Sequence, residues 1–279
     1  MSEAEHRLNL VVIDFSGTLS LGAVLFGRKE RLERALHTSG LWDLGINHPD
    51  IFWNELVNPT WEEGSTTSQG YATLLSTQVQ LWLRAQHREV PQRRVERSAR
   101  RFVNSYLRAS RIDAVWGGVL KYLLAVPFVT VIIATDHYAE ATAHIEAQLY
   151  RLAVGSSESK RALIVNSADV GAHKEDVAYW EHVRAQLPAL PREVILIDDF
   201  GANEHSLDAY ASGSAIARRR EATVAVLGQV FGGTVIVFDF VLARQHSMRS
   251  LQALRRVYRR KVQEVATFLH QELGKFDMS

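Results

Sequence analysis

The sequence predicts an α/β fold, a doubly wound, mostly parallel Rossmann-like sheet with an inserted α-helical cap domain. Two observations lead to this prediction. Short apolar runs alternate with helical patterns, and a long stretch after the first run holds helical patterns only. Alternating strands and helices are typical of a parallel sheet that helices cover on both faces.

The expected strands are short runs rich in Val, Ile and Leu, bounded by polar or turn residues. They span 8–13, 128–134, 162–165, 193–197 and 234–238. Their apolar residues follow one another without alternation, which is the pattern of strands buried on both faces. Helices are expected at 139–152, with Ala143, Ala147 and Leu149 or Tyr150 on one side, and at 175–187, where Val177, Trp180, Val183 and Leu187 recur at helical spacing.

Between the first two strands the chain shows amphipathic helical patterns at 28–39, 71–86 and 95–110. An insertion directly after the first strand lies over the carboxyl end of the sheet, where ligands bind in open α/β folds. We therefore expect a core of 1–20 and 112–243, a helical cap of 21–111, and a C-terminal amphipathic helix in 244–279.

The tail carries Leu251, Leu254, Tyr258, Val262, Val265 and Leu269 along one stripe, beside a group of arginines. The stripe indicates a helix that packs on the core or forms a homodimer. Binding of the basic face to an acidic partner or RNA is the alternative.

Composition narrows the class of protein. Hydrophobic residues make up 47% and charged residues 23%, the net charge is +1, and cysteine is absent. This balance is ordinary for a globular protein, and the near-zero charge gives no general attraction to nucleic acid or membrane. With no signal-peptide pattern and no spanning run, we expect a cytoplasmic protein without membrane or nucleic-acid partners.

Polar side chains follow the strands. Asp14 ends the first strand, with Gly17 and Thr18 just beyond it. The Asp14 carboxylate is either a catalytic group or the cap of a turn. Thr135 ends the second, able to donate to an anionic oxygen or to cap the next helix. Lys174 lies at the start of the helix expected from 175. Its ammonium group either neutralises the charge of a bound phosphate or is only solvated.

The fourth strand ends in Asp198 and Asp199. Two adjacent acids repel one another unless a cation or hydrogen-bond donors lie between them. Together with Asp14 they predict an all-oxygen site suited to Mg²⁺. Asn203 is in position to brace the loop that follows.

These residues, in this chain order, resemble the haloacid dehalogenase-like (HAD) superfamily. The matching motifs are Asp14-x-x-Gly17-Thr18, Thr135, Lys174 and the Asp198-Asp199-x-x-x-Asn203 loop. The resemblance implies a small phosphorylated substrate and displacement through an aspartyl intermediate, with Asp14, Thr135 and Lys174 as catalytic residues. It implies phosphate binding by Ser16, Gly17, Thr18, Thr135, Asp136 and Lys174, and Mg²⁺ held by Asp14, the Ser16 backbone carbonyl, Asp198 and Asp199.

Ser16 departs from the family pattern, which usually has a second Asp there as general acid and base. The loss of such a group costs about 10²–10⁴ in rate, and three interpretations follow. The first is a phosphatase with a good leaving group or a surrogate acid, for which the candidates are His137, His173, His205, Glu62 and Glu63. The second is cleavage of carbon–halogen or carbon–phosphorus bonds; the latter needs a cap lysine, and Lys29 is the sole candidate. The third is a catalytically impaired protein that binds phosphate and metal.

Overall fold

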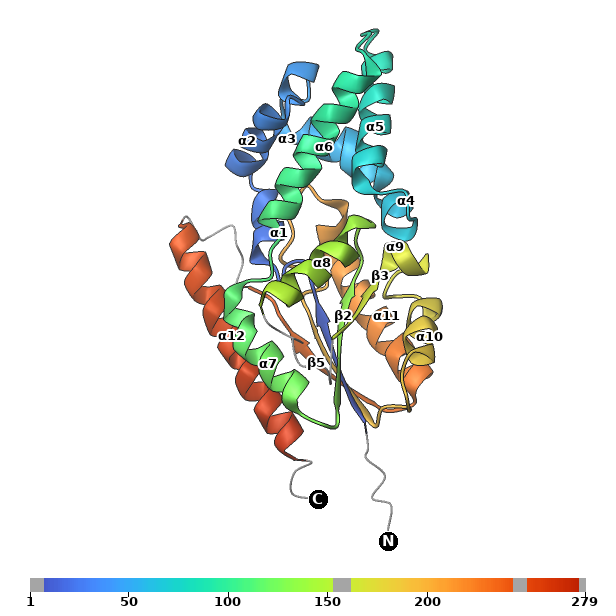
Figure 1. The fold of residues 1–279 in the computed structure, drawn as a ribbon, viewed down its shortest axis with the longest axis vertical. Helices are drawn as coiled ribbons and strands as arrows, with labels where there is room; N and C mark the ends of the chain where they lie inside the picture. Colours follow the sequence, from blue (N-terminus) through green and yellow to red (C-terminus); the bar gives the residue numbers. More distant parts are fainter. Residues whose placement is uncertain (1–7, 153–161, 243–249, 276–279) are drawn as a thin grey trace.

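The computed structural model describes residues 8–152, 162–242 and 250–275. Its centre is a five-stranded parallel sheet in the order β3-β2-β1-β4-β5 (Figure 1). The strands are β1 (Asn9–Asp14), β2 (Val129–Thr135), β3 (Leu163–Asn166), β4 (Glu193–Asp198) and β5 (Thr234–Asp239). The α/β fold class is confirmed, and the strand bounds differ little from the predicted ones.

Helices cover both faces of the sheet. On one face lie α7 (Gly117–Ala125), α8 (Glu140–Arg151) and α12 (Leu251–Gly274), and on the other α10 (Val177–Ala185) and α11 (Gly213–Phe231). Val11 and Ile13 of β1 pack into the first layer, whereas Leu10 and Val12 pack into the second. Because both faces of β1 are buried, its sequence has no polar alternation.

The tail helix α12 lies along α7 at the edge of the molecule (Figure 1). Its stripe of Leu254, Tyr258, Val262, Val265, Leu269 and Leu273 is buried in the same hydrophobic cluster as β1 and α7. The apolar stripe therefore packs on the core; its expected start, 244–249, lies outside the described residues. A homodimer through this helix stays a prediction. No helix in the described ranges is both long and apolar enough to cross a membrane.

Two details of the helices differ from the sequence prediction. In α8 the buried side holds Ala141, Ile145, Gln148 and Leu149, so the side predicted with Ala143 and Ala147 was wrong. Gln148 is buried because its amide bonds to the backbone of Ser110 and Ile112, where the chain returns to the core. Helix α10 begins at Val177, so Lys174 lies in the turn before it rather than opening it.

The segment between β1 and β2 is helical. Its longer helices are α1 (Leu21–Phe26), α2 (Lys29–Ser39), α4 (Trp61–Thr66), α5 (Tyr71–Ala85) and α6 (Gln92–Ala109), and shorter ones span Trp42–Leu44 (η1), Pro49–Ile51 (α3), Phe52–Val57 (η2) and Asn58–Thr60 (η3). From α2 to α6 these helices share a hydrophobic cluster of their own, whereas α1 packs into the core cluster. Two core residues join the cap cluster: Tyr138, after β2, is buried in it, and Leu207, after β4, packs against it. The predicted domain boundaries stay predictions.

Short helical turns complete the core at Ala114–Trp116 (η4), Ser167–Val170 (α9) and Ala209–Ala211 (η5). Of these, α9 lies at the end of the sheet that faces the cap (Figure 1), where it contacts α4. The carboxyl ends of the strands therefore meet the cap helices, and this is where the chemistry-bearing residues converge.

The turn after Asp14 is fastened to the tail helix by Tyr258. The Tyr258 hydroxyl donates to the carbonyls of Thr18 (2.7 Å) and Leu19 (3.0 Å) and accepts from Trp116 Nε1 (2.9 Å). Tyr258→Phe removes all three contacts inside a buried site, so we expect the free energy of unfolding to fall by about 1–3 kcal/mol. Urea unfolding measures this change. Tyr150→Phe is the control: Tyr150 is 83% exposed, and its variant should match wild type. Equal stability of all three proteins would contradict the assigned role of Tyr258.

Candidate active site

A cavity of about 90 Å³ lies between the carboxyl ends of the central strands and the cap helices. Asp14 ends β1 and Asp198 ends β4, and both line it together with Asp199. Ser16 and Asp136 line it as well, whereas Gly17, Thr18, Thr135 and Lys174 are not among its described lining residues. The structure thus brings five of the nine predicted site residues to the cavity wall.

Lys174 lies behind this wall and joins two of the acids. Its Nζ donates to Asp14 Oδ1 at 2.8 Å and to Asp198 Oδ2 at 2.6 Å. The backbone of Lys174 is fixed on both sides, since its N–H donates to Asp136 Oδ1 and its carbonyl accepts from Trp180 Nε1. All of these side chains are buried, so Lys174 is an internal cation rather than a solvated one.

The charges of this cluster do not balance. Burial, opposed by Lys174, raises the pKa of Asp14 well above its ordinary value, and burial with nearby acids does the same for Asp199. Burial alone lowers the pKa of Lys174, but Asp14 and Asp198 raise it well above the ordinary value, so the lysine stays charged. One ammonium cannot neutralise three buried carboxylates, and a proton or a further cation is required.

The residues fit a divalent cation. Asp14, Asp198 and Asp199 offer carboxylate oxygens that all lie within 4.8 Å of one another. Asp14 Oδ2 is buried and has no hydrogen-bond partner in the described part of the structure. A set of clustered carboxylates with a free oxygen is the hard, all-oxygen donor set that Mg²⁺ prefers.

Asp199 is held by the turn that follows it. Its Oδ1 accepts from Gly201 N and its Oδ2 from Asn203 N. The Asn203 amide donates in turn to the carbonyls of Gly17 (3.1 Å) and Phe240 (2.8 Å), which ties the loop after β4 to the turn after β1. Gly17 has φ +79°, and a Cβ there would lie 2.2 Å from Asp199 Oδ2. The bracing expected of Asn203 is therefore present, and the close approach of Asp199 requires a glycine at 17.

Ser16 has a partner that the sequence did not point to. Its hydroxyl donates to Glu204 Oε1 at 2.7 Å, across 188 positions of the chain. Burial and the neighbouring Asp208 raise the pKa of Glu204 to about 8, against the opposing Ser16 hydrogen bond. Glu204 also lines the cavity. The position that lacks an acid therefore holds an acid from the loop after β4, one that keeps its proton at neutral pH.

Two predicted hydroxyl groups are buried and unsatisfied. Thr135 Oγ1 ends β2 without a hydrogen-bond partner among the described residues, and the same holds for Thr18 Oγ1. The Thr18 carbonyl instead accepts from Trp116 and Tyr258 on the side of α12. Asp136 has both carboxylate oxygens engaged, by Lys174 N and by the Tyr210 hydroxyl, so its side chain is a positioning group here.

Three of the five surrogate acids proposed from sequence are not among the described residues that line the cavity. Glu62 and Glu63 are exposed on α4. His173 Nε2 contacts the Ser65 hydroxyl at 2.8 Å, which links the core loop to the cap. Lys29 is exposed on α2, and no lysine is among the described residues that line the cavity, so the cap lysine needed for carbon–phosphorus cleavage is missing from the cavity wall.

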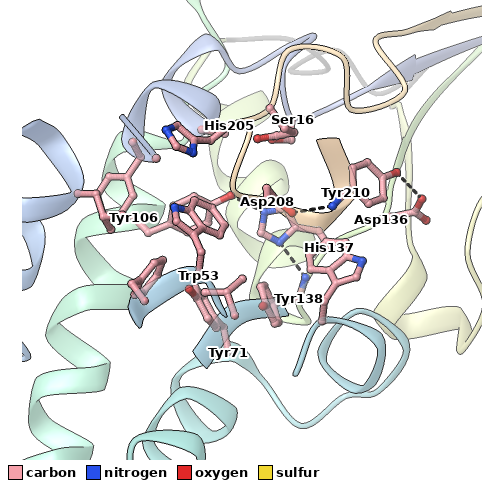
Figure 2. Close-up of a pocket in the computed structure, with 18 of the residues that line it drawn as sticks. Ser16, Trp53, Tyr71, Tyr106, Asp136, His137, Tyr138, His205, Asp208 and Tyr210 are labelled. Carbon is pink, nitrogen blue, oxygen red and sulfur yellow. Dashed lines mark hydrogen bonds between the residues drawn. The ribbon is translucent and has the colours of Figure 1, made fainter. Parts of the chain in front are cut away.

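The other two histidines belong to the cavity wall, as Figure 2 shows. His205 stacks on the Trp53 ring with centroids 5.9 Å apart. His137 Nδ1 accepts from Tyr138 N, and its Nε2 contacts the Tyr106 hydroxyl at 2.8 Å. Burial lowers the pKa of His137 to about 4, so this ring is neutral at physiological pH.

The pKa of His137 predicts a pH dependence of stability. An unfolded histidine binds a proton below about pH 6.5, whereas His137 in the folded protein resists protonation until about pH 4. Stability is therefore fully present above pH 6.5 and is lost as the pH falls toward 4, with a slope of at most about 1.4 kcal/mol per pH unit from this residue. Urea unfolding of wild type and His137→Gln over this range should show the shallower decline in the variant. The exposed His182→Gln should follow wild type, and identical slopes for all three would refute the prediction.

No family model and no curated protein sequence matches the chain. Among solved structures, a 2-haloacid dehalogenase from Pseudomonas syringae pv. tomato DC3000 aligns with a TM-score of 0.51 at 16% identity, over 91% of this chain and 99% of that chain. A predicted HAD-like family hydrolase from Porphyromonas gingivalis aligns at 16% identity over 90% of this chain and 98% of that chain, with a TM-score of 0.40. The L-2-haloacid dehalogenase PA0810 aligns at 11% identity over 91% and 98%, with a TM-score of 0.42. The alignment with a TM-score of 0.51 supports an assignment of the fold alone. This chain has the fold of the haloacid dehalogenase-like hydrolases.

Proposed function

We propose that this protein is a magnesium-dependent hydrolase of phosphate monoesters, with Asp14 as the nucleophile. One observation carries the proposal: three buried carboxylates, Asp14, Asp198 and Asp199, meet within 4.8 Å with a single lysine to balance them. A divalent cation would neutralise this excess of negative charge. The same cation would stabilise the charge on the phosphoryl oxygens during phosphoryl transfer.

Asp14, Asp198 and Asp199 would hold the metal, with the Ser16 backbone carbonyl as a further proposed ligand. When bound, Mg²⁺ neutralises charge on the phosphoryl oxygens. The protein's own residues supply the rest. Lys174 lowers the pKa of Asp14 against the larger opposing effect of burial and fixes its Oδ1, while Thr135 Oγ1 is an unused donor at the adjacent strand end.

Asp14 would act through one of its two carboxylate oxygens, while the other would help to hold the metal. In the first step the attacking oxygen forms a bond to phosphorus while the ester oxygen leaves, which gives a phosphorylated Asp14 and, once the leaving oxygen is protonated, the alcohol. In the second step water hydrolyses this acyl phosphate, which releases inorganic phosphate and restores the Asp14 carboxylate.

Glu204 is the proposed proton donor and acceptor of these steps. It would protonate the leaving oxygen in the first step and take a proton from the attacking water in the second. The Ser16 hydroxyl, 2.7 Å from Glu204 Oε1, would orient the carboxyl group. The pKa of about 8 suits this role, because a general acid works best when its pKa lies near the working pH. Ser16 is then a positioning residue, and the enzyme keeps its acid on a different loop.

A hydrolytic dehalogenase is the second candidate. The aligned structure with a TM-score of 0.51 is named a 2-haloacid dehalogenase, and Ser16 in place of an acid suits a reaction without a leaving alcohol. The cavity weighs against a haloacid, because a substrate carboxylate would meet Glu204 and Asp208 but no arginine or lysine among the described lining residues. Halide release from 2-chloropropionate in EDTA would favour this candidate.

The proposal predicts that hydrolysis of an aryl phosphate depends on metal and on Asp14. Wild type with Mg²⁺ should hydrolyse p-nitrophenyl phosphate and lose activity in EDTA. Asp14→Asn should abolish turnover, because the amide is a poor nucleophile, while Asp239→Asn, at the exposed end of β5, should stay active. Calorimetry with Mg²⁺ should show weaker binding by Asp199→Asn. Metal binding without turnover of any activated ester would identify a catalytically impaired protein instead.

The role of Glu204 predicts an effect that depends on the leaving group. Glu204→Gln should lower kcat for alkyl phosphates by about 10²–10⁴, because a poor leaving group needs the proton. For p-nitrophenyl phosphate the first step needs no acid, so the phosphorylated protein should accumulate and be detectable by acid quench and mass spectrometry. Ser16→Ala should give a smaller loss of about tenfold. An equal loss for alkyl and aryl esters would show that Glu204 is only structural.

A further inference from the structure

The cap side of the cavity is lined by aromatic rings. Trp53, Trp61, Tyr71, Phe102, Tyr106 and Tyr138 all face it, and Tyr71 stacks on Tyr138 with ring centroids 4.0 Å apart. Figure 2 shows Trp53, Tyr71, Tyr106 and Tyr138 around one space, with Asp208 among them. Aromatic faces carry negative charge and attract cations as well as apolar groups.

The acidic side chains on this side of the cavity have no basic counterpart among the described lining residues. Glu204 and Asp208 line the cavity, and no arginine or lysine is among its described lining residues. Arg219 is already engaged, with its guanidinium 3.3 Å from the Tyr210 ring centroid and hydrogen bonds to the Phe200 and Tyr210 carbonyls. A second anionic group on the substrate would therefore find acids and rings, but no basic partner.

Asp208 has no part in the proposed phosphoryl transfer. One carboxylate oxygen accepts from Tyr210 N at 2.9 Å. Its charge acts on Tyr71, Tyr106 and Tyr138, raising the pKa of each hydroxyl in addition to the larger effect of burial. Asp208 thus lies beside the aromatic wall as an acid without a catalytic task, and burial raises its own pKa to about 6.

We propose that the aromatic wall and Asp208 bind an organic cation, a substituted ammonium group carried by the leaving alcohol of the phosphate ester. A neutral apolar group would fill the aromatic space but leave the charge of the partly buried Asp208 with only the backbone N–H of Tyr210 as a partner. An anion would be repelled by Asp208. A substituted ammonium group satisfies both features, because its methyl groups pack on the rings and its charge pairs with Asp208. This inference rests on the proposed phosphatase function for the chemistry, but not for the binding.

The first test compares three esters in the presence of Mg²⁺. They are phosphocholine, its neutral isostere 3,3-dimethylbutyl phosphate, and 2-carboxyethyl phosphate. We expect kcat/KM to be at least about tenfold higher for phosphocholine than for the isostere, with the carboxylate ester slowest. Asp208→Asn keeps an oxygen that accepts from Tyr210 N. This variant should lower the ratio of kcat/KM for phosphocholine to kcat/KM for the isostere about tenfold. Glu55→Gln removes an exposed acid near Trp53 and should leave the ratio unchanged. An isostere hydrolysed as well as phosphocholine would overturn the inference while the phosphatase function stood.

The second test needs no turnover. Calorimetry with tetramethylammonium chloride and with neopentyl alcohol should show tighter binding of the cation to wild type, and weaker binding of the cation to Asp208→Asn and Trp53→Leu. If no ester is hydrolysed but the cation binds in this Asp208-dependent way, the site stands and the proposed function fails. If the cation binds no better than the alcohol, or binds Asp208→Asn equally well, the cation site is refuted.

Discussion

The site depends on one electrostatic constraint, the burial of more carboxylates than the protein supplies cations to neutralise. Lys174 bonds to Asp14 and Asp198 and so holds the ends of β1 and β4 together. Asp199 is satisfied by backbone N–H groups of its own loop instead. Taking such charges out of water is costly unless each has a partner, so an arrangement of this kind lowers stability, and buried charge clusters with shifted pKa values are typical of functional sites.

The scaffold keeps these charges in place through contacts between distant parts of the chain. Asn203 joins the loop after β4 to the carbonyl of Gly17, and Tyr258 of the tail helix holds the next two carbonyls of the same turn. The turn after Asp14 is thereby fixed both by the loop after β4 and by the tail helix. The tail helix, which the sequence predicted to pack on the core or to form a homodimer, is therefore also part of the support of the site.

Much of the fold could be predicted from sequence because the core strands are uninterrupted apolar runs, and each predicted acid lies directly after one. The contacts that could not be predicted depend on tertiary packing. Gln148 is buried because it bonds to the backbone of a distant segment, which reverses the face that alanine spacing suggested for α8. Glu204 follows Asn203 in an ordinary polar loop, and only its hydrogen bond to Ser16 marks it. The acid pair Asp198 and Asp199 after β4 was visible in the sequence, but the role of Glu204 in the same loop was not.

The exchange of an acid for Ser16 changes what the cavity can hold. A carboxylate at position 16 would add another negative charge beside Asp14, whereas the serine hydroxyl receives Glu204 from the opposite loop with a hydrogen bond. With Glu204 and Asp208 on the same loop and aromatic rings across the cavity, the groups that would move protons and those that would select the leaving group come from one segment and face the cap. Chemistry and specificity would then be linked through one segment, 204–208: Glu204 would complete catalysis, and Asp208 would set the sign of the charge that a leaving alcohol can carry into the cavity.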